Sequence, residues 1–162
     1  MSVQAKPIPD GFHTLTPYLA VKGAARAIDF YKSAFGAKER FRMPAPDGKC
    51  IGHAEILIGD SIVMLADEME TFGNRSPESL KGTPVGFMLY VPDADAAFKR
   101  AVEAGATVTR PLADQFYGDR SGTVSDPFGY QWTLSTHTED VPAEELKKRM
   151  AAACAKSAPG QK

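Results

Sequence analysis

The sequence predicts an α+β fold in which one β-α-β-β-β module occurs twice. The same order of strands and helix can be read in both halves of the chain, and both predicted helices end at a Gly-Ala pair. The glycines are Gly36 and Gly105, which gives an offset of 105 − 36 = 69 residues. That offset also places Met64 on Thr133 in the last hairpin of each half. Two separate anchors at one offset indicate an internal repeat.

The first module begins with a strand over residues 13–21, whose apolar side chains alternate. A helix over residues 24–35 follows, because its apolar residues recur at helical spacing and Gly36 can take the C-cap position. A second strand spans residues 38–42. A hairpin then forms about the Gly59-Asp60 turn. In that register Glu55 lies opposite Met64.

The second module repeats this order with strands over 85–91 and 106–112 and a helix over 93–104. Asp93 is placed to cap the helix at its N-terminus. The last hairpin forms about Asp126-Pro127-Phe128-Gly129, because Pro presets φ for a turn and Gly accepts the positive φ that follows.

The expected organisation is an arm, two modules, a linker between them and a tail. The boundaries are 1–13 for an extended N-terminal arm, 14–66 for the first module, 67–84 for the linker, 85–136 for the second module, and 137–162 for a C-terminal helix and tail. A linker of this length is compatible with modules that pair within one chain, and equally with domain swapping between two chains.

Composition excludes several classes of partner. The chain has 162 residues, 43% hydrophobic and 24% charged, with a net charge of −1. These values are ordinary for a globular protein, and no bulk field attracts nucleic acid or anionic lipid. No apolar run reaches the ~20 residues of a membrane helix, and no signal peptide is visible. Two distant cysteines do not form a disulfide framework. We therefore expect a cytoplasmic protein that binds neither nucleic acid nor membranes.

The helix AIDFYKSAFGA and the series FYGDRSGTVSDPFGYQWTLSTHTEDV carry a family resemblance. Over about residues 12–145 the chain resembles the vicinal oxygen chelate superfamily, which includes glyoxalase I, extradiol dioxygenases and the bleomycin and fosfomycin resistance proteins. The second series is similar to the PhnB-like branch. The resemblance implies curved mixed sheets around a cavity, with the helices outside, and a homodimer.

Metal-dependent members of that superfamily place a His or Glu on the first strand and a Glu on the last strand of each module. The resemblance puts the first-strand positions at Thr16 and at Val85 or Gly86, and the last-strand positions at Met64 and Thr133. A hydroxyl and a thioether do not replace imidazole and carboxylate as ligands of a hard divalent cation. We therefore expect no metal and no cofactor at these positions.

His53 and Glu55 are the candidate catalytic residues. They share one face of a strand, and Glu55 lies opposite Met64, so the pair is placed to act as an acid/base couple or as two ligands of an ion. The ordinary structural explanation is that both are merely solvated or ion-paired on the polar side of a strand.

The other candidates are expected to bind a ligand. Thr16, Tyr18, Met64 and Thr133 would line the cavity, with Trp132 on the opposite, core side of its strand. Tyr117, Asp119 and Arg120 cluster at the entry to the last hairpin, where Arg is suited to a carboxylate or phosphate. A structural Asp-Arg pair that fixes the loop is the alternative.

Two functions follow from these residues. The first is a binding protein, a homodimer that holds a small, partly apolar molecule in its cavity without changing it. The alternative is a lyase or isomerase of the glyoxalase type that uses His53 and Glu55, with or without a metal ion. The sequence does not decide whether a reaction is catalysed.

Overall fold

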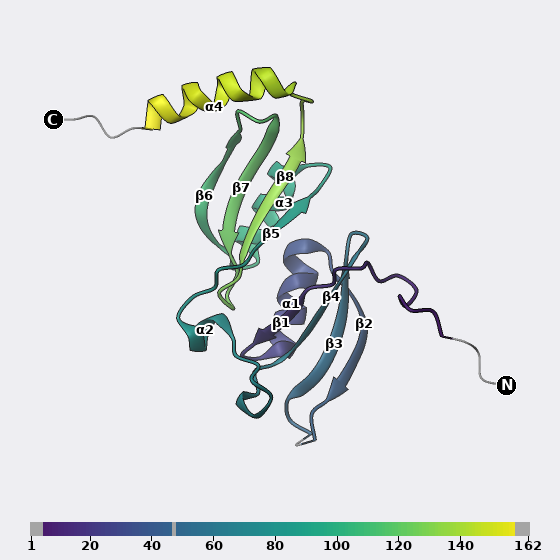
Figure 1. Ribbon diagram of the computed structural model, residues 1–162. Helices are drawn as coiled ribbons and strands as arrows, with labels where there is room; N and C mark the ends of the chain where they lie inside the picture. Colours follow the sequence, from purple (N-terminus) through teal and green to yellow (C-terminus); the bar gives the residue numbers. More distant parts are fainter. Residues whose placement is uncertain (1–4, 47, 158–162) are drawn as a thin grey trace.

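The computed structural model describes residues 5–46 and 48–157 (Figure 1). It contains two four-stranded sheets, with strand orders β1-β4-β3-β2 and β5-β8-β7-β6. In each sheet the first and last strands of the module pair in parallel and the other pairs are antiparallel. Figure 1 shows the sheet of the second module above that of the first. The edge strands β1 and β5 lie near each other, because Tyr18 and Phe87 line one surface hollow. Among the described residues no strand pairing joins the sheets, so they do not close into a barrel.

The predicted α+β fold with two β-α-β-β-β modules is confirmed. The first module comprises β1 (Tyr18–Val21), α1 (Ala24–Phe35), β2 (Lys38–Pro44), β3 (Ile51–Ile58) and β4 (Ser61–Asp67). The second comprises β5 (Gly86–Tyr90), α3 (Ala94–Glu103), β6 (Thr107–Asp114), β7 (Asp119–Ser125) and β8 (Gln131–His137). A terminal helix, α4 (Ala143–Ser157), follows.

Local sequence explains how the two module helices begin and end. Gly36 has φ +67° and its N–H bonds the Lys32 carbonyl, as a left-handed C-cap requires. Asp93 caps α3 as predicted, because its side chain accepts a hydrogen bond from the Ala96 N–H. The α1 N-terminus is capped from a distance: Asp67 at the end of β4 accepts the N–H groups of Gly23 and Ala24 at 2.8 Å each.

The segment between the modules is more structured than the expected linker. It contains a 3-10 turn, η1 (Glu70–Phe72), and a short helix, α2 (Pro77–Leu80). Ser76 caps α2, and Glu68 accepts bonds from the Ser76 N–H and the Ser79 hydroxyl. These contacts fix the crossing from one sheet to the other.

The first strand is shorter than the alternating pattern predicts. β1 begins at Tyr18, whereas the pattern places the strand from His13. The Thr16 hydroxyl donates to the His13 carbonyl, so residues 13–16 turn and do not extend the strand. As a result Leu15, expected on the core face, is 86% exposed.

The boundaries proposed for the arm, modules and tail stay predictions. Residues 1–4 of the arm, Asp47 of the 44–48 loop and residues 158–162 of the tail lie outside the described residues. Within the described part of the chain, no helix is both long and apolar enough to cross a bilayer.

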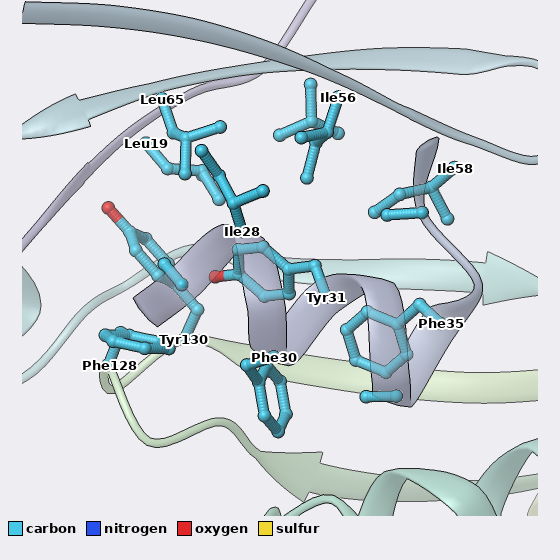
Figure 2. Close-up of a cluster of buried hydrophobic side chains, with 14 of the residues drawn as sticks. Leu19, Ile28, Phe30, Tyr31, Phe35, Ile56, Ile58, Leu65, Phe128 and Tyr130 are labelled. Atoms are coloured by element: carbon cyan, nitrogen blue, oxygen red, sulfur yellow. The ribbon is translucent and has the colours of Figure 1, made fainter. Parts of the chain in front are cut away.

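One hydrophobic core serves both modules. Figure 2 shows α1 with side chains of the first sheet on one side and Phe128 and Tyr130 of the second module nearby. The Phe30 ring lies 6.1 Å from the Phe128 ring, and the Phe35 ring lies 4.7 Å from the Trp132 ring. Trp132 is 3% exposed and faces the helices, as expected for core. The helix-facing sides of both sheets join this core. The other side of each sheet has no helix packed on it, and we call it the open face of that sheet.

Asp126 is the polar centre of this contact. Its carboxylate, 5% exposed as a residue, accepts four hydrogen bonds, at 2.8–2.9 Å. The donors are the Tyr31 hydroxyl of α1, the Trp132 indole N–H, and the backbone N–H groups of Phe128 and Tyr130. Burial raises the pKa of Asp126 even against these donors. The Tyr130 hydroxyl extends the connection, because it bonds both the N–H and the carbonyl of Ala20 on the edge of β1.

Asp126→Ala is expected to lower the free energy of unfolding by roughly 3–5 kcal/mol, because several buried donors lose their acceptor. Tyr31→Phe, which removes one donor, is expected to cost about 1 kcal/mol. Urea unfolding followed by tryptophan fluorescence measures both. Asp29→Ala, at an exposed position of α1, is the control and is expected to change stability by about 0.5 kcal/mol or less. An effect of Asp126→Ala as small as that control would contradict this role.

Candidate functional site

The open face of the first sheet brings together four of the predicted residues. β1 and β4 place Tyr18 beside Met64, and β3 and β4 place Glu55 on the other side of Met64. The register predicted about the Gly59-Asp60 turn is therefore confirmed. His53 lies two residues before Glu55 on the same face of β3, because side chains alternate along a strand.

The polar side chains of this face follow one another in a row, from Tyr18 through His53 and Glu55 to Arg40. The Tyr18 hydroxyl lies 3.0 Å from His53 Nδ1, and His53 Nε2 lies 3.6 Å from Glu55 Oε1. Arg40 NH1 donates to Glu55 Oε2 at 3.2 Å. The side chains of His53 and Glu55 are 21% and 20% exposed. Burial raises the pKa of Tyr18, so its hydroxyl is a neutral hydrogen-bonding group at pH 7.

Thr16 is not brought to this row. It lies before the start of β1, is partly buried, and its hydroxyl donates to the His13 carbonyl. Pro17 is the residue that meets β4, through a bond from the Met64 N–H to the Pro17 carbonyl. Alternation read backwards across Pro17 is what placed Thr16 on the sheet.

The open face of the second sheet is lined by hydroxyl groups. Thr133 is flanked by Met88 on β5 and Thr123 on β7, and the Thr123 and Thr133 hydroxyls are 2.9 Å apart. Met88 is 50% exposed. Ser121 and Ser135 lie on the next row and are fully buried. Thr133 thus lies on the open face, opposite to Trp132, as expected from alternation.

Asp119 is buried at the end of this face, with 3% exposure. Its carboxylate accepts bonds from the hydroxyls of Tyr90 and Ser135 at 2.9 Å and meets His137 Nδ1 at 2.8 Å. Burial by itself would raise the pKa of Asp119, but the bonds from His137, Tyr90 and Ser135 outweigh it and hold the pKa below its usual value. Asp119 therefore stays ionised, and its bond raises the pKa of Tyr90.

Arg120 and Tyr117 do not join Asp119. Arg120 points to the other side of β7, where NH2 meets Asp95 of α3 at 2.7 Å and NH1 meets Asp114 of β6 at 3.1 Å. These pairs fix β7 to α3 and β6. The Tyr117 hydroxyl lies 3.1 Å from the Ser121 hydroxyl and helps to cover the Ser121 row.

Tyr90 and His137 were not among the site residues predicted from the sequence. Tyr90 lies two residues after Met88 on β5, so the alternation of side chains along a strand places both on the open face. Asp119 and His137 are partners across the last hairpin, so the register about the 126–129 turn is the signal that could have found this pair. Within the described parts of the chain, no three His, Cys, Asp or Glu side chains gather in an arrangement that could hold a metal ion.

A cleft of about 370 Å³ is lined by residues of both modules and borders both open faces. It lies between the edge of β5 and the turn from β3 to β4, and its lining includes Leu15, Ile62, Met88 and Tyr90. Large apolar side chains remain exposed here and elsewhere on the open faces. They include Tyr18, Phe41, Met43, Met88 and Tyr90, each 48–59% exposed.

The sequence of the chain is similar to a large family. The profile of the Glyoxalase/Bleomycin resistance protein/Dioxygenase superfamily matches residues 11–134. Protein Rv0887c of Mycobacterium tuberculosis is 49% identical over 139 residues, which cover 84% of this chain and 81% of the relative. Protein At5g48480 of Arabidopsis thaliana is 33% identical over 115 residues, which cover 67% of this chain and 69% of the relative.

Solved structures show the same fold. The crystal structure of the Arabidopsis protein has a TM-score of 0.62 at 31% identity and covers 76% of this chain and 98% of its own. TioX from Micromonospora has a TM-score of 0.60 at 28% identity and covers 80% of this chain and 100% of its own. A PhnB protein from Bacillus cereus, 17% identical with a TM-score of 0.59, covers 76% of this chain and 99% of its own and shares the fold.

The contacts of His137 with two carboxylates predict that the stability of the protein depends on pH. The bonds of this ring to Asp119 and then to Asp140 raise the pKa of His137 from the ordinary 6.5. A raised pKa means that the protonated ring stabilises the folded state fully below the unfolded value, and that this stabilisation is lost as the pH rises through the folded pKa. The free energy of unfolding should therefore fall as the pH rises from about 6.5 through the raised pKa of His137.

His137→Gln should show a smaller fall in urea unfolding over the same pH range. The pKa of His137, followed by the NMR shifts of its ring protons, should lie above that of a free histidine. A pKa at or below 6.5 would contradict the two carboxylate contacts.

Proposed function

Because the chain belongs to the Glyoxalase/Bleomycin resistance protein/Dioxygenase superfamily, we propose that it uses the cavity side of its sheets to bind a small, partly apolar molecule without changing it. The observation that carries this is the composition of the two open faces. Exposed side chains such as Met43 and Met88 lie among polar groups that already have partners, such as Glu55 and Thr133. A mostly apolar surface with a few fixed polar groups is the ordinary form of a small-molecule site.

The charges of these faces also support binding of an uncharged ligand. Glu55 is paired with Arg40, and Asp119 is paired with His137. Arg40 and His137 are therefore not free to bind a ligand carboxylate or phosphate. Arg120, the residue expected to do so, is engaged by Asp95 and Asp114 on the other side of its sheet.

A second copy of the chain is the partner proposed to complete the cavity. Large apolar side chains are about half exposed on both open faces, and contiguous exposed patches of this kind mark interaction surfaces. The two sheets of one chain do not close over these faces, at least in the described residues. In a homodimer, the open face of one module would cover that of the partner's other module, an arrangement that domain swapping also provides.

The alternative function is a lyase or isomerase of the glyoxalase type. The specific observation in its favour is the chain Tyr18–His53–Glu55, in which a phenol, an imidazole and a carboxylate are placed in series. Such a series is able to hold and pass a proton. In this reading His53 is the base, Glu55 orients it, and Tyr18 meets the substrate oxygen.

The binding proposal predicts a thermal shift in a screen of uncharged small molecules. A ligand at 100 times its Kd adds about 2.7 kcal/mol to the free energy of unfolding. For a domain of this size that corresponds to a rise in Tm of roughly 5–10 °C. Mass spectrometry and NMR should recover the ligand unchanged from the complex. Two results would favour the alternative: turnover of the ligand, or a stoichiometric metal ion in the purified protein. Either should be lost in His53→Ala or Glu55→Ala.

The dimer proposal predicts that a charge on the open face separates the subunits. Met88→Glu is expected to convert a species of twice the chain mass into a monomer in sedimentation velocity, because burying an unpaired carboxylate is unfavourable. Val102→Glu, on the outer surface of α3 at 39% exposure, is the matched control and should stay dimeric. A wild-type monomer at every concentration, or an unchanged dimer in Met88→Glu, would contradict this interface.

A further inference from the structure

A separate hollow of about 320 Å³ lies at one end of the first sheet. It is bordered by the loop that joins β2 to β3 and by the turn that follows β4 (Figure 1). Small, buried residues form its base, namely Ala45 and Ala66 at 5% and 3% exposure. Large, exposed side chains form its rim, namely Tyr18, Met43 and Phe72.

The sequence creates this hollow by a change in side-chain size along the open face. On β4 the open face carries Met64 and then Ala66. The surface is therefore lower at Ala66, because the alanine side chain is much smaller than that of methionine. On β3, Gly52 allows the Pro44–Pro46 segment to approach: a Cβ on Gly52 would lie 3.2 Å from the Ala45 Cα. The segment thereby closes one side of the hollow.

The opposite side is closed by the turn over residues 69–74. The Met69 N–H bonds the Asn74 carbonyl at 3.0 Å, which holds the turn together. Phe72 projects from it and is 76% exposed. A phenylalanine ring exposed to this degree at the rim of an apolar hollow has apolar surface to bury on a bound molecule.

The hollow has one charged lining residue, and its charge is already compensated. Asp67 Oδ1 accepts the N–H groups of Gly23 and Ala24 at the α1 N-terminus, and Oδ2 accepts the Ile51 N–H at 2.7 Å. Both carboxylate oxygens are thus engaged by backbone donors. An ionic ligand would find no counter-charge here, whereas an uncharged one meets no penalty from Asp67.

The other polar side chains that line the hollow are those of Asn74 and Tyr18, and the Tyr18 hydroxyl has a partner that sets its direction. Because the Glu55 carboxylate faces His53 Nε2, it favours the proton on that nitrogen and leaves Nδ1 as an acceptor. Tyr18 then donates its hydroxyl proton to Nδ1, over 3.0 Å, and its oxygen lone pairs remain available to accept. The group that matches this oxygen is a hydrogen-bond donor.

We propose that this hollow binds an uncharged apolar group of one or two fused rings that bears one hydroxyl, with the hydroxyl donating to Tyr18 and the rings lying between Ala66 and Phe72. The volume is near the lower end of small-molecule pockets, ~300–1,000 Å³, which sets the size of the group. The inference rests on the proposed binding function and names the class of ligand for one part of the site.

Two matched probes test it on the full chain. 2-Naphthol carries the hydroxyl, and 2-methoxynaphthalene has the same rings but no donor. Fluorescence titration should give a Kd for 2-naphthol that is lower by roughly 2- to 10-fold, the effect of one neutral hydrogen bond. Tyr18→Phe should remove this preference and leave the affinity for the methyl ether nearly unchanged.

The position of the site is tested with Ala66→Leu, which should weaken both probes at least tenfold by filling the base of the hollow. Ala151→Leu adds the same volume at an exposed position of α4 and should leave both affinities unchanged. If Ala66→Leu does not fold, Phe72→Ala replaces it, since an exposed side chain is not needed for folding. Phe72→Ala should weaken both probes severalfold.

Each outcome separates this inference from the broader function. Probe binding that is unaffected by both Ala66→Leu and Phe72→Ala, or equal affinity for the two probes, overturns the hollow and leaves the binding function standing. Failure of both probes to bind at their solubility limits also overturns it. The broader function fails only if no uncharged molecule of the wider screen raises the Tm.

Discussion

The buried carboxylate of Asp126 is the contact on which the arrangement of this protein depends. It gathers the hydroxyl of Tyr31 from the first module and the indole N–H of Trp132 from the second. A carboxylate at 5% exposure is tolerable only when its oxygens are fully hydrogen-bonded. Because one of the donors belongs to α1, the 126–129 turn and α1 hold each other in place. The helix-facing sides of both sheets are committed to the shared core as a consequence. The open faces are what remains for function.

Those open faces differ in their polar groups but share one property. The first carries Tyr18, His53 and Glu55 in series with Arg40, and the second carries Asp119 with Tyr90 and His137. In each, the carboxylate has a cation as its partner, so neither Glu55 nor Asp119 is a free charge. Groups that are already paired orient a ligand at little reorganisation cost, which suits a pre-formed site for an uncharged molecule. The same pairing in the first face is what keeps a proton-transfer role open for His53.

The hollow beside Ala66 and the part of the proposed dimer surface around Met88 lie on the open faces of different sheets. The hollow is bounded by segments of a single module, the 44–46 loop and the 69–74 turn. The exposed residues Met88 and Tyr90 belong to the other module and need a covering surface from elsewhere. A ligand held in the hollow would therefore present its outer side to whatever covers the sheets. The size of the whole ligand depends on that cover, whereas the chemistry at Tyr18 depends on one chain alone.

The sequence by itself determined the repeat, the helix ends and the hairpin register. These are local properties: Gly36 and Asp93 act on their own helices, and the Gly59-Asp60 turn fixes Glu55 opposite Met64 within ten residues of chain. It failed at Thr16, because alternation was extended across a turn that its own hydroxyl stabilises.

Only the tertiary structure decided which polar groups meet. Tyr31 reaches Asp126 across 95 residues, and Arg120 of β7 reaches Asp95 of α3 across 25. Both contacts depend on how α1 and α3 pack against the strands, and no local pattern encodes that packing.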